Sequence, residues 1–343
     1  MVKRWKAPFV LCIFVVAMMG FGAWYDHQAR QAPPTIIKGT ITMYTDLPNN
    51  VTSLLAQQYQ EEHHMQVNVL PLTQQQMETR MKEGDTNNGD VVITTKDNLV
   101  MGAKEGLFQP VLSENIDLVS LDFKDEDNKW VGFYYDPLVF VENTTFFNGL
   151  GQFITTWETV EKPGTWTAVI SDFGASQSSA NTLYSFVEKY GNDNAMMRLK
   201  RMEAHITQHA KYLDTPIRLA SLGEVNVGIG NFSDANYYVA NGYPVKMIFP
   251  QDGTTYNLVG VAVTANSLQR EESIAFVNWL LSKHVAEVMQ HNGFYFFFTN
   301  PEVPDPKDSF NRPIHLWDIK GGYTVEGKKA ILNTWLRTVR FNK

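Results

Sequence analysis

Apolar runs that read as strands alternate with helical segments through the first part of this chain, and this alternation constrains the fold more than any other feature. We expect strands at 39–44, 66–70 and 90–94, with helices at 50–62 and 74–83. Such alternation is typical of an α/β protein with a largely parallel sheet. The sequence therefore predicts an α/β fold in which helices cover the faces of the sheet.

A strand-like pattern returns in the stretch from Gly223 to Thr254. Apolar residues alternate with small or polar ones at 225–229, and residues 244–249 form another apolar run. Ser233 and Asp234 stand between the two runs, where a short helix should begin. We expect this stretch to form one wall of a ligand cleft.

The N-terminus carries the basic residues Lys3, Arg4 and Lys6, followed by an uncharged apolar run that ends near Tyr25. A basic region before a long apolar run is typical of an export signal. The run is close to the shortest length that crosses a bilayer, so residues 1–31 form either a cleaved signal peptide or an uncleaved signal anchor. Both alternatives place the rest of the chain in a periplasmic or extracellular location, tethered to the membrane in the second case.

Composition excludes two classes of site from the exported part. Cys12 is the only cysteine and lies within the apolar run, which leaves no internal disulfide and no thiolate metal site. The formal net charge of −7 becomes −10 once the three basic residues before the apolar run are removed. Nucleic-acid grooves depend on clustered Lys and Arg, so we expect no nucleic-acid partner.

Polar side chains follow the carboxyl ends of two predicted strands. Thr45 and Asp46 come after the first strand, and Thr94, Thr95 and Lys96 come after the third. Open α/β sheets bind their ligands at this edge, which makes these residues candidates for ligand binding. Helix N-caps use the same residue types, and that alternative stays open here.

A second candidate element is DFGASQSSAN at 172–181. Ser176, Ser178 and Ser179 stand directly before a predicted helix at 182–190. Backbone N–H groups at a helix N-terminus attract anions, and serine hydroxyls add neutral donors. The alternative is that these serines only cap the helix.

Two histidine pairs are candidates for a metal site. His205 and His209 lie four residues apart on a predicted helix, and His63 and His64 are adjacent. Zinc sites need at least three protein donors, and no third ligand stands at a recognisable spacing. We therefore expect no metal site at either pair.

Six segments carry a family resemblance that covers nearly the whole exported chain. In order they are ITMYTDLPNNVTSLLAQQYQ with QVNVL, GDVVIT leading to AKEGLFQPV, KWVGFYYDPLVFVEN, ISDFGASQSSANTLYSF, GEVNVGIGNFSDA with PVKMIFPQDGT, and SIAFVNWLLSKHVAEVMQHNGFY. Each segment alone is a degenerate pattern. Their order and spacing resemble an extracellular solute-binding protein of an ABC importer, in the group that binds ferric ion, phosphonates, sugar phosphates or thiamine.

The resemblance implies a two-lobed type II periplasmic-binding fold with a hinge of crossing strands that lets the lobes close over a solute. The crossings are expected near 134–142 and 247–263. The implied parts are 1–31 as signal peptide or anchor, 36–137 as the first part of lobe 1, 138–258 as lobe 2, 259–300 as the return to lobe 1, and 301–343 as a C-terminal helical segment packing across the lobes.

Two helices are expected near the C-terminus. One spans Ser273–His291 in lobe 1, and an amphipathic helix spans Thr324–Arg340. The buried side of the final helix is predicted to carry Ile331, Leu332, Trp335 and Leu336.

Ferric-ion binders of the resembled group use a histidine after the first strand, a glutamate after the third, and a tandem tyrosine pair. The matching positions in this chain are Pro48, Thr95, and the pair Ser233 and Asp234. Two hydroxyls and one carboxylate carry too little negative charge for a ferric ion. The chain therefore departs from the iron-binding pattern at every matching position.

The preferred prediction is a non-enzymatic protein that captures a small anionic organic solute, phosphorylated or phosphonylated, without a cofactor. The predicted ligand-binding residues are Thr45, Asp46, Thr94, Thr95, Tyr135, Ser176, Ser178, Ser179, Ser233 and Asp234. In the context of the resemblance, the serines before the helix are expected to bind the anion, Asp234 to face a hydroxyl or ammonium group, and Tyr135 to stack on the solute or hydrogen-bond to it. The expected partners are ABC-transporter permease subunits, and we expect a monomer.

Three alternatives stand beside this prediction. Tyr237 and Tyr238, one helical turn beyond the matched pair, are the alternative ligands for iron. A membrane-anchored ligand sensor would share the fold and keep its N-terminal segment. A hydrolase or transferase would use Asp46, Asp234 or His291, but the sequence has no nucleophile motif to support it.

Overall fold

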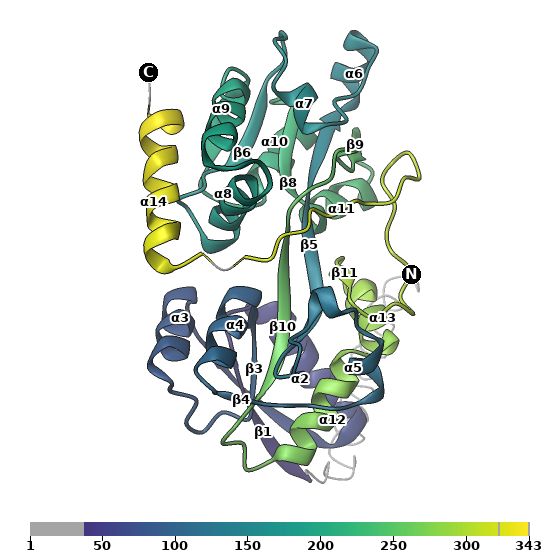
Figure 1. Ribbon diagram of the computed structural model, residues 1–343. Coiled ribbons are helices and arrows are strands. Elements are labelled where there is room, and N and C mark those ends of the chain that lie inside the picture. The colour runs from purple at the N-terminus through teal and green to yellow at the C-terminus, as the bar shows by residue number, and fades with distance from the viewer. Residues whose placement is uncertain (1–37, 322, 342–343) are drawn as a thin grey trace, which may run out of the picture.

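The computed structural model describes residues 38–321 and 323–341, so the predicted signal segment at 1–31 lies outside the described residues. The described residues form two α/β lobes, which stand one above the other in Figure 1 and are joined by two long strands. Within these ranges, no helix is long and apolar enough to cross a membrane.

The first lobe starts with three parallel strands, each followed by a helix. They are β1 (Gly39–Thr45), α2 (Asn49–His63), β2 (Met65–Pro71), α3 (Gln74–Glu83), β3 (Val91–Thr95) and α4 (Lys96–Lys104). β1 lies between β2 and β3 and pairs with both in parallel. The predicted α/β class is confirmed, and the predicted elements of this region differ from these bounds by one residue at most.

Local side-chain chemistry explains why α3 begins and ends where it does. The Thr73 hydroxyl accepts a hydrogen bond from the Gln76 backbone N–H at 3.2 Å, and the Gln76 side chain accepts one from the Thr73 N–H at 2.8 Å. This capping box satisfies two N–H groups that the helix itself cannot. Gly84 follows at a φ of 74°, in the left-handed region where a residue with a side chain is strained.

Two strands cross between the lobes. β5 (Val131–Asn143) pairs with β10 (Tyr256–Thr264) as far as Pro137, and from Leu138 onward it pairs with β8 (Val227–Asn231). The strand order is β2-β1-β3-β10-β5-β8-β6-β7, with β10 antiparallel to both of its neighbours. The predicted bounds of the lobes remain a proposal, which this change of pairing partner supports.

The second lobe contains α6 (Thr144–Leu150), α7 (Trp157–Val160), β6 (Ala168–Ser171), α8 (Gln177–Tyr190), α9 (Asn192–Met202), β7 (Ile206–Ala210), α10 (Thr215–Ser221), β8, α11 (Phe232–Ala240) and β9 (Val245–Ile248). The helix predicted at 182–190 begins at Gln177 instead. Ser176 and Ser179 form a capping box that fixes the start. Ser178 and Ser179 are therefore inside the first turn of α8, not before it.

The prediction that His205 and His209 share a helix is wrong, because α9 ends at Met202 and His209 lies in β7. The His205 ring stacks on Trp166 at 3.8 Å between centroids and lies within hydrogen-bond distance of two backbone carbonyls. His209 Nε2 lies 3.0 Å from a Glu203 carboxylate oxygen. The described residues contain no group of three or more His, Cys, Asp or Glu that could hold a metal ion.

The chain returns to the first lobe through β10, which leads into α12 (Arg270–Leu280), α13 (Lys283–His291) and β11 (Phe297–Phe298); β4 (Phe108–Gln109) and α5 (Glu114–Leu118) complete this lobe. The single helix predicted at 273–291 is two helices. Ser282 interrupts it with extended backbone, and its hydroxyl accepts a hydrogen bond from the Val285 N–H at 3.3 Å.

After β11 the chain runs as an extended segment along the second lobe, then lines the space between the lobes and ends in α14 (Val325–Trp335), followed by a π-helical turn, Leu336–Arg340. α14 stands beside α8 and α9 of the second lobe (Figure 1). Its Ile331 and Trp335 side chains are buried in the core of this lobe as predicted, whereas Leu332 and Leu336 are only half-buried.

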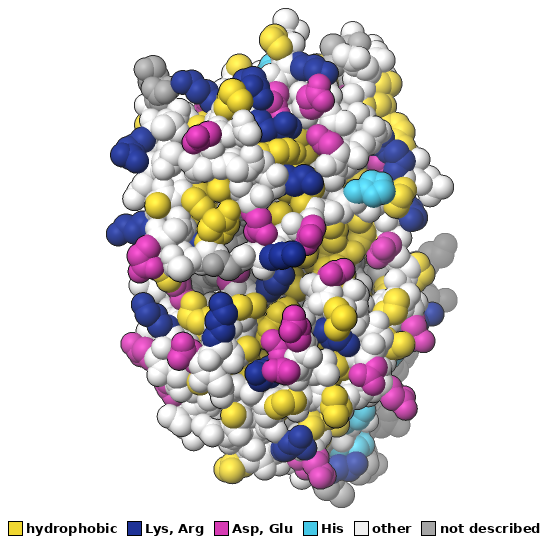
Figure 2. Space-filling model, viewed as in Figure 1, with side chains coloured by type: hydrophobic (Ala, Val, Ile, Leu, Met, Phe, Trp, Pro, Cys, Tyr) yellow, Lys and Arg dark blue, Asp and Glu magenta, His cyan; other side chains and the backbone are white. Residues whose placement is uncertain are grey.

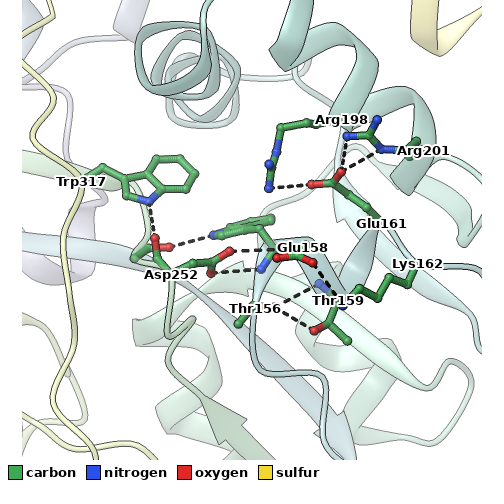
Figure 3. Close-up of polar contacts among 11 residues, drawn as sticks. Thr156, Glu158, Thr159, Glu161, Lys162, Arg198, Arg201, Asp252 and Trp317 are labelled. Atoms are coloured by element: carbon green, nitrogen blue, oxygen red, sulfur yellow. Dashed lines mark hydrogen bonds and ion pairs between the residues drawn. The ribbon is translucent and has the colours of Figure 1, made fainter.

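Trp317 fastens the extended segment to the second lobe. Its Nε1–H donates to the Asp252 carbonyl at 3.1 Å, as Figure 3 shows, and its ring packs edge-on against Phe186 at 5.1 Å. The Trp317 backbone N–H also donates to the Thr254 carbonyl at 2.8 Å. The segment is thereby held in place immediately before it reaches the space between the lobes.

Candidate functional site

A cavity of about 830 Å³ lies between the lobes. Its walls come from α3 and α4 of the first lobe, from α8 of the second lobe, from the start of β10, and from residues 319–321 and 323–332, which we call the C-terminal wall. In the same view as Figure 1, Figure 2 shows apolar side chains in the depression between the lobes, with basic and acidic side chains along its rim. Concave sites of this size and mixed lining are typical of small-molecule binding.

Three residues of the cavity lining each have a buried side-chain oxygen without a hydrogen-bond partner: Thr95 Oγ1, Asn98 Oδ1 and Asn257 Oδ1. Thr95 is the N-cap residue of α4, but its hydroxyl makes no capping hydrogen bond. Asn98 is almost wholly buried, and its side-chain N–H donates to the Thr94 hydroxyl at 2.9 Å. Leaving such groups without a partner costs free energy, so these side chains would gain hydrogen bonds by turning toward a solute in the cavity.

The charge of the cavity lining is net positive. The lysines are Lys96, Lys104, Lys320, Lys328 and Lys329, and the acids are Glu78, Asp97 and Glu188. Lys96, at the first position of α4, is half-buried, and burial lowers its pKa, whereas nearby carboxylates such as Asp97 raise it. The N-termini of α4 and α8 both contribute to the lining, and their backbone N–H groups favour an anion.

The serines of the second lobe lie near this cavity in two groups. Ser176 lines it, whereas Ser178 and Ser179 line a separate space of about 10 Å³ within the second lobe. The Ser176 hydroxyl accepts from the Ser179 N–H at 3.2 Å, and the two hydroxyl oxygens lie 3.0 Å apart. Both hydroxyls thus take part in capping α8, and Ser176 is the one placed to reach a solute in the cavity as well.

A group of carboxylates lies along the hinge, outside the lining of the cavity. Asp46 follows β1, Asp136 lies in β5, and Asp234 lies in the first turn of α11. Burial raises the pKa of Asp136 from 3.8 to about 7, and burial together with the charge of Asp214 raises that of Asp234 to about 6. Burial also raises the pKa of Asp46, opposed by the Thr94 hydroxyl.

Within this acidic group the hydrogen bonding is uneven. The carboxylate of Asp136 accepts from Ser233 through both its backbone N–H and its hydroxyl. Both carboxylate oxygens of Asp46 are buried and accept no hydrogen bond of normal geometry. Ser233 is therefore committed to Asp136, whereas Asp46 has unsatisfied acceptor capacity.

The remaining predicted residues lie away from the cavity lining. Thr45 and Thr94 are fully buried; Thr45 accepts from the Leu47 N–H at 3.1 Å, and Thr94 accepts from the Asn98 side chain. Tyr135 stacks between Phe123 and Phe297. The alternative iron ligands do not line the cavity either: Tyr237 is 53% exposed, and Tyr238 packs edge-on against Tyr243 at 4.9 Å.

The structure adds cavity residues that sequence patterns did not single out. They are Asn98 and Asn257, the aromatic residues Tyr184 and Tyr256, and the side chains of the C-terminal wall, including Tyr323 and Lys328. Asn98 could have been found, because it lies one helical turn after Thr95 on the same face. Asn257 and the C-terminal wall reach the site only through long-range packing, which leaves no local signal.

Comparison with known proteins is consistent with this geometry. A family model described as "Bacterial extracellular solute-binding protein" matches residues 87–314. An uncharacterized protein of Haemophilus influenzae is 27% identical over 73% of this chain and 75% of its own length. Iron uptake protein A1 of Synechocystis sp. is 23% identical over 86% of this chain and 88% of its own.

Among solved structures, the periplasmic binding protein AfuA of Actinobacillus pleuropneumoniae, with fructose-6-phosphate bound, matches with a TM-score of 0.71 and 23% identity. The match covers 89% of this chain and 99% of that one. At this identity the likeness shows the fold, which is that of a two-lobed periplasmic binding protein.

Proposed function

Because the chain belongs to the family of bacterial extracellular solute-binding proteins, we propose that it captures a small anionic organic solute, phosphorylated or phosphonylated, and delivers it outside the cytoplasm to an ABC-transporter permease. The observation that carries the proposal is that Lys96 lines the cavity together with three residues whose buried side-chain oxygens have no hydrogen-bond partner. These residues are Thr95, Asn98 and Asn257. A cation supplies attraction for an anion, and neutral hydrogen-bonding groups recognise the rest of an organic solute.

One of the similar proteins supports this proposal, and another supports the alternative that the solute is ferric ion. One structural neighbour holds a sugar phosphate, and one relative is named an iron uptake protein. The observation that favours iron is the buried carboxylate of Asp46, whose two oxygens accept no hydrogen bond of normal geometry and lie near the Thr94 hydroxyl. A ferric ion prefers several anionic oxygen donors, and the alternative ligands Tyr237 and Tyr238 lie outside the cavity lining, so we favour the organic anion.

Of the residues predicted to bind the solute, Thr95 and Ser176 line the cavity, and we propose them as direct contacts together with Lys96, Asn98 and Asn257. For Asp46, Asp136 and Asp234 we propose a role at the hinge, where the lobes move against each other. Tyr135, buried among aromatic rings of the same hinge, would support that movement rather than stack on the solute.

Thermal unfolding with and without candidate solutes tests the proposal. The panel contains fructose 6-phosphate, phosphoglycerate, methylphosphonate, inorganic phosphate and ferric citrate. A ligand at a hundredfold excess over its dissociation constant stabilises the folded protein by about 2.7 kcal/mol. We expect a saturable rise of the melting temperature with one of the organic phosphates or phosphonates; a rise with ferric citrate alone would support the iron alternative and overturn the proposal.

A further inference from the structure

The cavity between the lobes has a third wall, which comes from the part of the chain beyond β11. This C-terminal wall, residues 319–321 and 323–332, contributes Lys320, Tyr323, Lys328 and Leu332 to the lining. It lies beyond residues 87–314, the part of the chain that the family model matches. The family match therefore gives no information about the contribution of this wall to the site.

The wall is attached firmly to the second lobe. The carboxylate of Glu188, on α8, accepts hydrogen bonds from the Lys320 N–H at 2.6 Å and the Gly321 N–H at 3.1 Å. Farther along, Trp335 is buried against Phe173, with 5.0 Å between ring centroids. When the lobes move, this wall must accordingly move with the second lobe.

Two contacts join the wall to the first lobe across the cavity. Lys328 Nζ lies 2.7 Å from Asp97 Oδ2, and Lys96 Nζ lies 3.4 Å from the Ile319 carbonyl. Asp97 and Lys96 both belong to the first turn of α4, next to the unpartnered hydroxyl of Thr95. Lys96 and Lys328 thus both place an ammonium group where the C-terminal wall meets the first turn of α4, and a helix N-terminus favours an anion.

The Lys328 side chain is also held in position by an aromatic ring. Its Nζ lies 5.5 Å from the centroid of Tyr184, and the Tyr184 and Tyr323 rings lie 6.3 Å apart. Asp97 does not depend on Lys328 alone, because the dipole of α4 stabilises a carboxylate in its first turn. When the Lys328 ammonium moves from Asp97 to an incoming anion, the carboxylate of Asp97 is therefore still stabilised by the helix.

We propose that the C-terminal wall is a third structural part of the solute site and that Lys328 is a specificity-determining residue, which exchanges its ion pair with Asp97 for the anionic group of the solute. This inference rests on the proposed function, because it assumes that the solute is an anion. The position of the wall, its attachment to the second lobe and its ion pair across the cavity do not depend on which solute binds.

The first arm of the test measures affinity by calorimetry for the same panel of solutes, with wild type, Lys328→Met, Lys328→Arg and the control Arg337→Met. Lys328→Met keeps an apolar stem beside Tyr184 and removes the charge, whereas Arg337→Met removes one positive charge from the exposed end of the same helical segment. We expect about tenfold weaker binding for Lys328→Met, rescue by Lys328→Arg, and no change for Arg337→Met. Equal affinities in all four proteins would overturn the role of Lys328.

The second arm needs no solute and measures amide hydrogen exchange. Lys328→Met should raise exchange about three- to fivefold at residues 319–321 and 323–325 and in the first turn of α4, with no change in Arg337→Met. Unchanged exchange there would overturn the attachment of the wall to the first lobe. If no solute of the panel bound to wild type, the proposed function would be wrong. The exchange measurement would still show whether Lys328 joins the C-terminal wall to the first lobe.

Discussion

The carboxylate of Asp136, midway along the crossing strand β5, accepts two hydrogen bonds from Ser233, at 3.0 Å from its backbone N–H and 2.6 Å from its hydroxyl. This pair ties the start of α11 in the second lobe to the hinge. These hydrogen bonds lower the pKa of Asp136, but burial raises it by more, and the pKa is about 7. The hinge therefore contains a carboxyl group that the fold holds partly protonated at neutral pH.

The first prediction concerns the pH dependence of stability. The folded pKa of Asp136 lies above its unfolded value, so the folded state binds more protons between about pH 4 and pH 7, and the free energy of unfolding falls as pH rises through this window. Asp136→Asn removes the titration; its amide oxygen accepts from the Ser233 backbone N–H, and its NH2 group donates to the Ser233 hydroxyl. Urea unfolding should show the variant more stable than wild type at pH 8, by on the order of 2 to 4 kcal/mol, and nearly equal to it at pH 4.

The control for this experiment is Asp193→Asn, which changes an exposed carboxylate at the start of α9. Its stability relative to wild type should be the same at both pH values. A constant difference between Asp136→Asn and wild type across the whole range would show that the Asp136 carboxyl does not titrate as described.

The second prediction concerns Gly253, which carries a φ of 84° and lies against Trp317. A Cβ at this position would stand 2.7 Å from a ring atom of Trp317. Gly253→Ala should therefore lower the free energy of unfolding by about 2 kcal/mol, through backbone strain and displacement of the ring. Chemical denaturation measures this loss, and Gly149→Ala, where a Cβ meets nothing within 4 Å, is the comparison.

The third prediction separates capping from solute binding at Ser176. Ser176→Ala removes the N-cap of α8 and should cost about 1 kcal/mol of stability, whereas Ser176→Asp keeps a good cap. Because Ser176 lines the cavity, the added charge of Ser176→Asp should repel an anionic solute and weaken binding at least tenfold. Full affinity in Ser176→Asp, measured by calorimetry, would mean that this serine only caps the helix.

The fourth prediction concerns Thr95, whose buried hydroxyl has no partner. Thr95→Val keeps the shape of the side chain and removes this unsatisfied group, so the solute-free protein should keep or slightly gain stability. Affinity for the solute should fall about tenfold. Thr40→Val, at an exposed position of β1, provides the matched control and should leave both quantities unchanged.

The first lobe and the first crossing strand could be predicted largely from the sequence, whereas the return predicted at 247–263 merges the end of β9 with β10, which begins at Tyr256. Period-two and helical patterns are strong there, and the capping box at Thr73 gives α3 the predicted bounds. The break at Ser282 was missed because apolar residues continue at helical spacing on both sides, although a serine N-cap was a readable signal. Likewise, the capping box of Ser176 and Ser179 places the start of α8 earlier than apolar periodicity alone suggested.

The candidate site could be predicted only where it follows a local rule. Thr95 and Lys96 stand at the carboxyl end of a parallel strand, which is the expected edge for a ligand. Asn257 and Lys328 enter the same cavity from positions more than 150 residues farther along the chain. Their contribution depends on how the crossing strand and the C-terminal wall pack, and no sequence period encodes that arrangement.

The most direct test of the central claim is the ratio of solute affinities between wild type and Lys96→Met, measured by calorimetry at low salt. The claim that an anionic organic solute binds beside Lys96 predicts saturable binding of a phosphorylated or phosphonylated solute to wild type and at least tenfold weaker binding to the variant. Equal affinity in both proteins, or binding of ferric citrate alone that survives Lys96→Met, would contradict it.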